Sequence, residues 1–414
     1  MQLQKQLLTE ELFYPEFVTK RVEHYYTERV EKTWNGGHIL RGRTPDDNSI
    51  VLMSNDYLSL ANHPDVIQAQ AISLLQQGNG MMMSGVFLDH SSPQKKFEEE
   101  MADFMQSESA IISQSGWCAN IGLIQSLAEE STPIYIDMFA HMSLWEGIQS
   151  AGATARAFRH NDPASLEKMI CQHGPGVILV DSIYSTSGRI CPLAEIADIA
   201  QRFGCIFIVD ESHSLGTHGE HGEGLVAELG LTNQVHFRTA SLAKAFCGRA
   251  GIITCPAWFS DYFMQEAKPA IFSSTLLPHE IASLLASLDV IRNDKWRRTR
   301  LQENATYLRN ALDQLGYNVS ASQSQIISLE SGDEKQTMIL RDALESRGLF
   351  GAVFMAPATP KKRSIIRFSV QASMTQQEMQ HMIDVCRDVR EEVDMINWPS
   401  TRRKNRALHL ARGI

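Results

Sequence analysis

The chain has 414 residues, of which 43% are hydrophobic and 21% charged, and its formal net charge at pH 7 is −10. This length allows two or three lobes around a large core, and the acidic balance argues against a general nucleic-acid binder, because phosphate binding rests on Lys and Arg. Seven scattered cysteines without a C-x-x-C pair predict free thiols rather than disulfides or a zinc site. We find no signal-peptide pattern and no apolar run near the ~20 residues of a membrane span, so we expect a cytoplasmic protein.

The first part of the chain, residues 1–60, is predicted to be an N-terminal arm that contains a helical stretch of mixed charge. Residues 61–285 then alternate short apolar runs with helical patterns, which is typical of a mostly parallel sheet covered by helices on both faces. We therefore predict a large α/β domain here. The expected strands are 109–113, 133–137, 176–181, 205–210, 235–240 and 251–255, and the expected helices include 118–130, 165–173 and 192–204.

The pattern changes after a long helical stretch at 276–316. Residues 286–395 contain the strand patterns "SQIISLE" and "SIIRFSV" and end in a helical pattern, which predicts a smaller C-terminal α+β domain. The last segment, 396–414, is a basic extension. We interpret it as a solvated surface tail in preference to a nucleic-acid contact.

The ends of the predicted strands are unusually polar. The segments "VDESHSLGTHG", "VDSIYSTSG" and "DMFAHMSLWEG" each begin at the end of a strand, and "SQSGWCANIG" is a Ser-Gly turn that opens a helix. Ligands of open α/β sheets bind beyond the carboxyl ends of the strands, and the free N–H groups of a helix N-terminus favour an anion such as a phosphate. We therefore place the functional site at this edge of the sheet.

One lysine, Lys244, lies in a run of small residues, "TASLAKAFCGRAG" at 239–251. Small neighbours let a ligand approach closely and do little to hold an ammonium group in water. Pyridoxal 5′-phosphate (PLP) needs a lysine for its Schiff base, a carboxylate that keeps the ring nitrogen protonated, a flat partner for the ring and a helix N-terminus for the phosphate. Each feature is weak alone, but together and in this order they predict a PLP site.

At this point the sequence resembles a known family. The Lys244 segment resembles the lysine loop of the α-oxoamine synthases, which are fold-type I, class II aminotransferase-like PLP enzymes that join an amino acid to an acyl-CoA. The blocks "SNDYLSLANHP", "SQSGWCAN", "AHMSLWEG", "STSGRICPLAEI", "VDESHSLGTHG" and "IFSSTLLP" resemble that family in order, over about residues 50–380. The residues of three segments are most similar to bacterial synthases of α-hydroxyketone quorum-sensing autoinducers. These segments are "SQSGWCANIGL", "IDMFAHMSLWEG" and "VDSIYSTSG".

The resemblance implies a set of cofactor-binding residues. Lys244 would be the Schiff-base lysine, and Asp210 would pair with the ring nitrogen. The remaining cofactor contacts implied are His213 and Ser185 at the phenolic oxygen of the ring, His141 on the ring face, and the backbone of Trp117 and Cys118 with Ser241 at the phosphate.

It also implies substrate contacts and an assembly. Arg367 would pair with the substrate carboxylate, and Asn55 would lie near the mouth of the site. Ser274 would reach the phosphate bound by the other subunit, which implies a homodimer with its site at the subunit interface. The partners expected are therefore an acyl-CoA, an amino-acid substrate and a second copy of the chain, without nucleic acid.

The function implied is that of a PLP-dependent acyl-CoA:amino acid C-acyltransferase. It would condense 2-aminobutyrate or a similar small amino acid, or S-adenosylmethionine, with a medium- or long-chain acyl-CoA. Decarboxylation would then give an α-aminoketone precursor of an α-hydroxyketone signal. Two alternatives stay open, namely a metabolic synthase that uses glycine or alanine and a non-catalytic regulator of the same fold.

Some features of the sequence depart from the family or mimic other sites. Ser241 stands where the family usually has Thr, and "GNGMMMSGVFLDH" at 78–90 replaces a Gly-rich segment with a basic residue, which would suit a long acyl chain. "GEGLVA" follows a loop and so is not a dinucleotide fingerprint. The histidines of "HSLGTHGEHG" match no ligand spacing, so we expect no metal.

Overall fold

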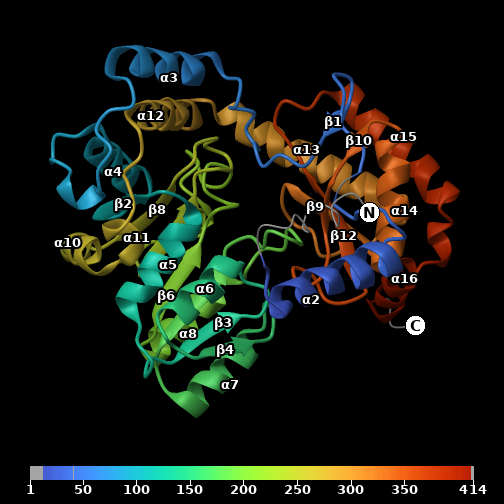
Figure 1. The fold of residues 1–414 in the computed structure, drawn as a ribbon, viewed down its shortest axis with the longest axis horizontal. Coiled ribbons are helices and arrows are strands. Elements are labelled where there is room, and N and C mark those ends of the chain that lie inside the picture. Colours follow the sequence, from blue (N-terminus) through green and yellow to red (C-terminus); the bar gives the residue numbers. More distant parts are fainter. Residues whose placement is uncertain (1–12, 41, 412–414) are drawn as a thin grey trace.

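The computed structural model describes residues 13–40 and 42–411. Figure 1 shows two lobes side by side, a large lobe at the left of the view and a small lobe at the right. The large lobe is built on a seven-stranded sheet, and the small lobe on a three-stranded antiparallel sheet.

The large sheet has the strand order β2-β8-β7-β6-β5-β3-β4. Neighbouring strands are parallel except at β8, which runs antiparallel to both β2 and β7. The six predicted strands are confirmed to within two residues, and β4 was missed because "ARAF" is short and only its last residue is buried. The strands are β2 (Ser109–Ser113), β3 (Ile134–Asp137), β4 (Ala155–Phe158), β5 (Val177–Asp181), β6 (Ile206–Asp210), β7 (Phe237–Ser241) and β8 (Gly251–Cys255).

Helices cover both faces of this sheet, as predicted. In β5, Leu179 packs into one hydrophobic cluster and Ile178 into another, because successive side chains of a strand point to opposite faces. One cluster contains residues of α5 (Gly116–Leu127), α6 (Met142–Ser150) and α10 (Ala257–Glu266). The other contains residues of α4 (Pro93–Phe104), α7 (Pro163–His173) and α8 (Leu193–Phe203).

The small lobe is confirmed as an α+β unit. Its sheet has the order β11-β12-β9, and the N-terminal part of the chain joins it through a parallel pair, β1 with β10. Its elements are β1 (Ile50–Val51), β9 (Ile326–Gly332), α14 (Glu334–Glu345), β10 (Leu349–Phe350), β11 (Ala352–Phe354), β12 (Ser364–Ser369) and α15 (Gln376–Glu392). The arm before them contains α2 (Glu16–His24) and a π-helix (Tyr25–Thr33).

The predicted long helix at 276–316 is two helices. α12 (Pro278–Asn293) and α13 (Lys295–Gln314) are separated by Asp294, whose backbone is not helical. α12 packs against α3 (Pro64–Gln77) in the large lobe, and α13 packs against α15 in the small lobe. The pair therefore passes from one lobe to the other along the top of Figure 1.

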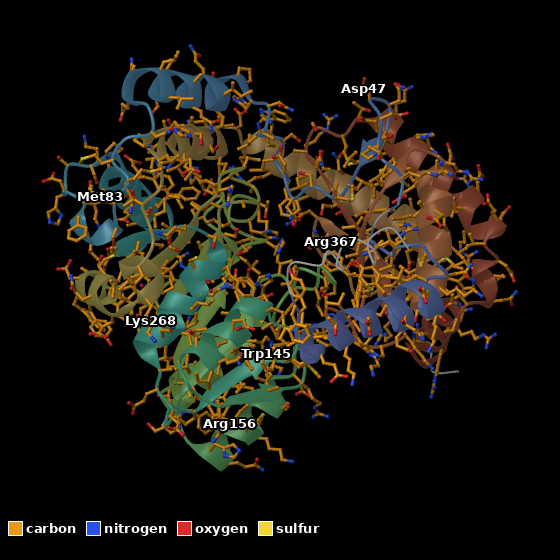
Figure 2. The ribbon with its side chains drawn as sticks, in the orientation of Figure 1. Asp47, Met83, Trp145, Arg156, Lys268 and Arg367 are labelled. Carbon is orange, nitrogen blue, oxygen red and sulfur yellow. The ribbon has the colours of Figure 1, made fainter. Side chains whose placement is uncertain are left out.

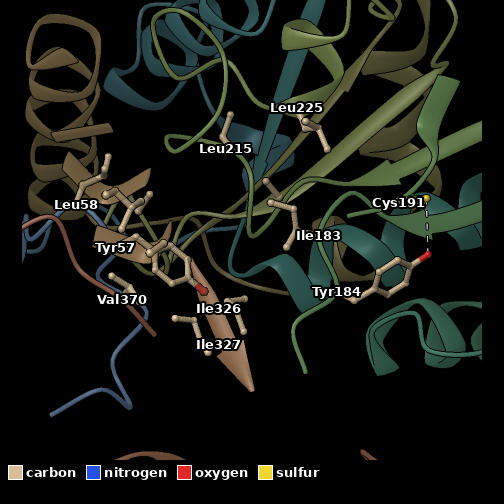
Figure 3. Packing of buried hydrophobic residues seen from close by; sticks show 14 of the residues in the cluster. Tyr57, Leu58, Ile183, Tyr184, Cys191, Leu215, Leu225, Ile326, Ile327 and Val370 are labelled. Atoms are coloured by element: carbon tan, nitrogen blue, oxygen red, sulfur yellow. Dashed lines mark hydrogen bonds between the residues drawn. The ribbon is translucent and has the colours of Figure 1, made fainter. Parts of the chain in front are cut away.

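One hydrophobic cluster extends across both lobes. Figure 3 shows Ile183 of the large lobe in the same cluster as Tyr57 and as Ile326 and Val370 of the small lobe. All four side chains are at most 1% exposed. Because this packing is dense and shared, it fixes the position of any site built where the lobes meet.

The interpretation of the C-terminus as a solvated tail is wrong for its described part. Residues 399–411 form α16 (Pro399–Ala411), in which Thr401 and Lys404 are buried. Lys404 Nζ lies 2.8 Å from Asp313 Oδ1, and Arg403 pairs with Glu330. Acidic residues of the small lobe thus neutralise two of the charges that suggested solvation. In the part of the chain that the structure describes, no helix is long and apolar enough to cross a membrane.

Candidate active site

A cavity of about 220 Å³, here called the lysine cavity, lies at the carboxyl ends of the large sheet. Six of the predicted site residues line it together, although they come from four separate segments of the chain. These six are Trp117, His141, Asp210, His213, Ser241 and Lys244. Residues that the sequence did not single out complete its lining, namely Ser115, Gly116, Asn120, Ser143, Asp181, Ile183 and Ser212.

The N-terminus of α5 forms one wall of the lysine cavity. Ser115 Oγ caps the helix by accepting from the backbone N–H of Cys118 at 3.1 Å, so this N–H, predicted to bind phosphate, already has a partner. The first N–H groups of a helix have no acceptor within the helix, which leaves those of Gly116 and Trp117 for an anion. A Cβ at Gly116 would lie 2.6 Å from Ser241 Cβ, so only glycine allows this close packing.

Asp210 is the last residue of β6 and is 4% exposed. Its Oδ2 accepts from Asn120 Nδ2 at 2.7 Å, and its Oδ1 accepts from the backbone N–H of Ser212 at 2.9 Å. Asn120 is itself fixed, because its Oδ1 accepts from Thr239 Oγ1 at 2.6 Å. The carboxylate is therefore held in one orientation. Sequence analysis missed Asn120, whose signal was its position one helical turn after Gly116.

A second carboxyl group, Asp181, lies beside Asp210 on the neighbouring strand. The two residues are register partners across the β5–β6 pair. Burial, and then the charge of Asp210, raise the pKa of Asp181 well above its usual value. Asp181 Oδ1 accepts from the backbone N–H of His141 at 3.0 Å. The raised pKa favours the protonated form of Asp181, and the side chain holds the backbone of His141 in place.

Lys244 projects from a compact turn between β7 and β8. The backbone N–H of Gly248 donates to the carbonyl of Leu242 at 3.0 Å, and a Cβ at Gly248 would meet Leu284 at 2.2 Å. Burial lowers the pKa of the Lys244 ammonium, the charge of Arg367 lowers it further, and the charge of Asp210 opposes both. The small residues of this segment therefore allow close packing around a lysine that loses its proton more readily than usual.

Both histidines of the cavity are neutral near pH 7. Burial, followed by the charges of Lys244 and Arg367, lowers the pKa of His213 well below its usual value, and burial also lowers that of His141. His213 Nδ1 lies 2.7 Å from the hydroxyl of Tyr57, and His141 Nδ1 lies 2.7 Å from Ser143 Oγ. These contacts fix the orientation of both rings.

The edge of Trp117 also faces His141. The two ring centroids are 6.2 Å apart and nearly perpendicular, and the Trp117 side chain is partly exposed at the cavity.

The predicted substrate residues form a group at the junction of the lobes, where Figure 2 places Arg367. Arg367 extends from β12 and donates from Nη1 to the carbonyl of Ser185 at 2.7 Å and from Nη2 to Asn55 Oδ1 at 2.9 Å. Its Nε is buried and has no hydrogen-bond partner among the described residues. Arg367, Ser185 and Asn55 are outside the lining of the lysine cavity, but the charge of Arg367 acts on Lys244 and His213.

Ser274 lies away from this group. It is exposed, its carbonyl accepts from Gln114 Nε2 at 2.8 Å, and it forms a β-bridge with Ser84. The segment with the methionines at 81–83 lies next to the Ser274 segment, because the carbonyl of Met83 accepts from the N–H of Thr275 at 2.8 Å. Figure 2 shows Met83 at the outer edge of the large lobe.

The residues present fit PLP. The lysine cavity combines free N–H groups at the start of a helix, a fixed buried carboxylate, neutral imidazoles and a lysine of lowered pKa. No group of three or more metal-ligating side chains occurs within residues 13–40 and 42–411.

Comparisons with known proteins agree with this fit. Residues 47–385 match the family model for class I and II aminotransferases. The chain is 46% identical over 374 residues to the CAI-1 autoinducer synthase of Vibrio campbellii, which covers 90% of this chain and 95% of that protein. It is 31% identical to an 8-amino-7-oxononanoate synthase of Marinomonas sp., over 80% of this chain and 83% of that one.

Solved structures show the same likeness. A serine palmitoyltransferase from S. paucimobilis with bound PLP and myriocin superposes with a TM-score of 0.85 at 25% identity, over 92% of this chain and 100% of that one. The 8-amino-7-oxononanoate synthase of Francisella tularensis gives a TM-score of 0.74 at 26% identity, over 84% and 99% of the two chains.

Proposed function

The chain belongs to the class I and II aminotransferase family, and within it to the PLP-dependent α-oxoamine synthases, and from this premise we propose which reaction it catalyses. It is a PLP-dependent acyltransferase of the acyl-CoA-condensing type. The proposed substrates are a medium- or long-chain acyl-CoA and either a small amino acid such as 2-aminobutyrate or S-adenosylmethionine. The proposed product is an α-aminoketone, formed with loss of CO₂, that is a precursor of an α-hydroxyketone autoinducer.

One observation carries this proposal. Lys244, Asp210 and the free N-terminus of α5 face a single cavity, in a chain that is 46% identical to a CAI-1 autoinducer synthase. The first part of this observation supports PLP chemistry. The second part supports an autoinducer precursor rather than a metabolic aminoketone.

Each residue has a role that follows from its position. PLP, when bound, supplies an electron sink for the carbanion at the substrate Cα. Lys244 holds the cofactor covalently, and its Nζ then takes and returns the Cα proton, because a lysine of lowered pKa is a base near neutral pH. Asp210 would keep the ring nitrogen protonated. His213, which lines the cavity, and Ser185, which lies outside its lining, would contact the phenolic oxygen.

The remaining residues bind and orient. The N–H groups at the start of α5, with Ser241, would bind the phosphate, and His141 would pack against the ring. Arg367 binds the substrate carboxylate beside Asn55, which is supported by its buried and unpartnered Nε among the described residues. A carboxylate would give this N–H group its missing acceptor.

The proposed assembly is a homodimer in which Ser274 of each subunit contacts the phosphate bound by the other. The exposed aromatic side chains beside it, Phe272 and Phe87, support an interface here, because such side chains are rarely left in water in a group. Mass measurement by light scattering tests the dimer. Mixing the Lys244→Ala and Ser274→Asp proteins tests the shared site, because only a mixed dimer would regain activity.

Thiol release tests the proposed reaction. The PLP-loaded protein is titrated with 2-aminobutyrate, S-adenosylmethionine, glycine or alanine together with acyl-CoAs of different length, while free CoA thiol is followed. We expect release only when both substrates are present, and a fall of at least about 10³-fold in the Lys244→Ala protein. A preference for glycine or alanine would support a metabolic synthase. A protein that binds PLP but releases no thiol with any pair would be a regulator of the same fold.

A further inference from the structure

A second cavity, here called the arginine cavity, lies between the lobes and has a volume of about 190 Å³. None of its lining residues has a role in the reaction as described above. The large lobe contributes Phe139, His160 and the turn after β5, and the small lobe contributes β9, the start of β12 and the loop before it. Its characteristic lining residues are Phe139, His160, Ser187, Arg189, Glu330 and Arg363.

A single turn connects the two cavities. Ile183 and Ile190 form an antiparallel bridge that closes this turn, and Ile183 lines the lysine cavity whereas Arg189 lines the arginine cavity. The carbonyl of Ser185, in the same turn, accepts from Arg367. One short turn of the chain therefore contributes to the walls of both cavities.

The turn is also rigid, because it is packed against β9. The backbone at Gly188 has φ +70°, and a Cβ there would lie 2.2 Å from the carbonyl oxygen of Ile326. The N–H of Gly188 donates to the carbonyl of Tyr184 at 2.8 Å. The position of Arg189 relative to the lysine cavity is thus set by the fold.

The small lobe supplies a matching track along β12. Arg367 and Ile365 are two positions apart and so lie on the same face of the strand, opposite Ser328 and Glu330 of β9. Ile365, Ser328 and Glu330 line the arginine cavity, and Arg363 directly precedes the strand. The same sheet face therefore runs from the substrate group at Arg367 to the arginine cavity.

The arginine cavity carries an excess of positive charge. Arg189 is half-buried, and no ion pair joins its guanidinium to a carboxylate in the described part of the chain. Glu330 is shared between Arg363, whose Nε lies 3.2 Å from it, and Arg403. The loop that closes the cavity also carries two exposed lysines in "TPKKRS" at 359–364. Such a surplus is unusual in a chain of net charge −10.

This lining selects one kind of ligand. Arginine binds phosphate groups through paired N–H donors, and hydroxyl groups such as those of Thr186, Ser187 and Ser328 bind amide and ester groups. Phe139 offers an aromatic face at the rim. A sulfonium or ammonium substrate would be repelled by the same charges.

We propose that the arginine cavity binds the phosphate-bearing end of the acyl-CoA, with Arg189 and Arg363 contacting its phosphates and the thioester end reaching the lysine cavity past Ser185 and Arg367. This inference rests on the proposed acyl-CoA condensation. It assigns a capture site for the carrier that is separate from the site of chemistry.

Calorimetric titration of the PLP-loaded protein with CoA tests the site without any turnover. Arg189→Gln and Arg363→Gln should each weaken CoA binding by about tenfold, since each removes charge-assisted hydrogen bonds to phosphate. Arg387→Gln is the matched control, because Arg387 is half-exposed in the same lobe and pairs with Asp384. ATP should bind more weakly than CoA, which separates recognition of CoA from a general affinity for polyphosphates.

Kinetics provide the second measurement. In both variants the KM for acyl-CoA should rise about tenfold, with kcat within about twofold of the original. The KM for the same acyl group on pantetheine, which lacks the nucleotide, should not change. An equal loss with acyl-pantetheine, a shift in the KM for the amino substrate alone, or unchanged CoA binding would each overturn the assignment.

Failure of this site and failure of the proposed reaction look different. If CoA binds through these arginines but no thiol is released, the site stands and the condensation is wrong. If thiol is released and both variants bind CoA normally, the condensation stands and the site is wrong.

Discussion

The lysine cavity and the arginine cavity share one turn of the chain, but their ionisable groups differ. Those of the lysine cavity are mostly shifted toward the neutral form, whereas the arginines of the other cavity are charged and partly exposed. In the lysine cavity burial lowers the pKa values of His213 and His141 and raises that of Asp181, each toward the neutral form, and the carboxylate of Asp210 has two fixed donors. In the arginine cavity Arg189 has no ion pair among the described residues, Arg363 shares Glu330 with Arg403, and Arg189 and Arg363 are both partly in solvent. The comparison suggests a division of labour in which burial sets protonation for chemistry and partly exposed charge captures the substrate.

The walls of the two cavities differ as well. Strand ends and a helix N-terminus form the lysine cavity, so its side chains are placed by the main sheet. The arginine cavity is closed by a turn from one lobe and a loop from the other. Small changes in the packing of the lobes should therefore affect the binding of CoA in the arginine cavity more than the reaction in the lysine cavity.

After the loss of Lys244, the largest effect expected is from Asp210→Asn. Removing the anionic partner of the ring nitrogen should lower the rate of thiol release by about 10²–10³-fold, while Asn120 and the Ser212 N–H still have a polar group to contact. Single-turnover kinetics and the circular dichroism of bound PLP measure this, with Asp198→Asn on exposed α8 surface as control. If the rate were unchanged, the buried carboxylate would have no part in the chemistry.

Arg367→Lys should have the next largest effect. A lysine cannot donate to the Ser185 carbonyl and Asn55 Oδ1 at once and also reach a carboxylate, so the KM for the amino substrate should rise about 10–100-fold. The KM for acyl-CoA should stay within about twofold of its original value, because Arg367 belongs to the chemical site. If only the KM for acyl-CoA rose, Arg367 would act in acyl-CoA binding, and the proposed separation of roles between the two cavities would be wrong.

The pH dependence of stability tests how dry the lysine cavity is. His213 and His141 have folded-state pKa values below the usual 6.5, so the unfolded chain binds more protons below that pH. The free energy of unfolding should therefore have its full value above about pH 6.5. Below that pH it should fall, by up to about 1.4 kcal/mol per pH unit for each histidine.

Thermal unfolding between pH 5 and 8 checks this slope. His213→Gln should flatten it, and His173→Gln, at an exposed position, should leave it unchanged. A stability that rises on acidification would mean that these rings are charged in the folded protein.

The smallest effect expected is from Glu330→Gln. It frees Arg363 and Arg403 from their shared carboxylate, so CoA should bind about two- to fivefold more tightly, and added salt should weaken CoA binding more steeply. Calorimetry at two ionic strengths measures both. Weaker binding in this variant would show that Glu330 orients the arginines rather than competing with the ligand.

Much of this organisation was predictable from sequence. The buried strands carry continuous apolar runs and end in polar residues, so their bounds and the edge that holds the site could be read directly. β4 was not predicted because Ala155 and Arg156 are partly exposed. The packing of α16 was not predicted because its partners, Asp313 and Glu330, are distant in sequence.

The supporting residues of the site were harder to find. Asn120, Asp181 and Tyr57 act through contacts with Asp210, His141 and His213, and no local pattern marks such contacts. The arginine cavity joins "STSGR" to "TPKKR", segments about 170 residues apart whose proximity only the fold creates.

The edge-on contact between Trp117 and His141 gives the protein an optical reporter of its own. The indole is 44% exposed and lines the lysine cavity, so its fluorescence responds to whatever occupies that space. Emission from this position would be quenched when a conjugated ring binds and would recover when the ring leaves. Loading and loss of the cofactor can thus be timed in the unlabelled protein, with Trp117→Phe, which keeps the five other tryptophans, as the reference that isolates the signal of Trp117.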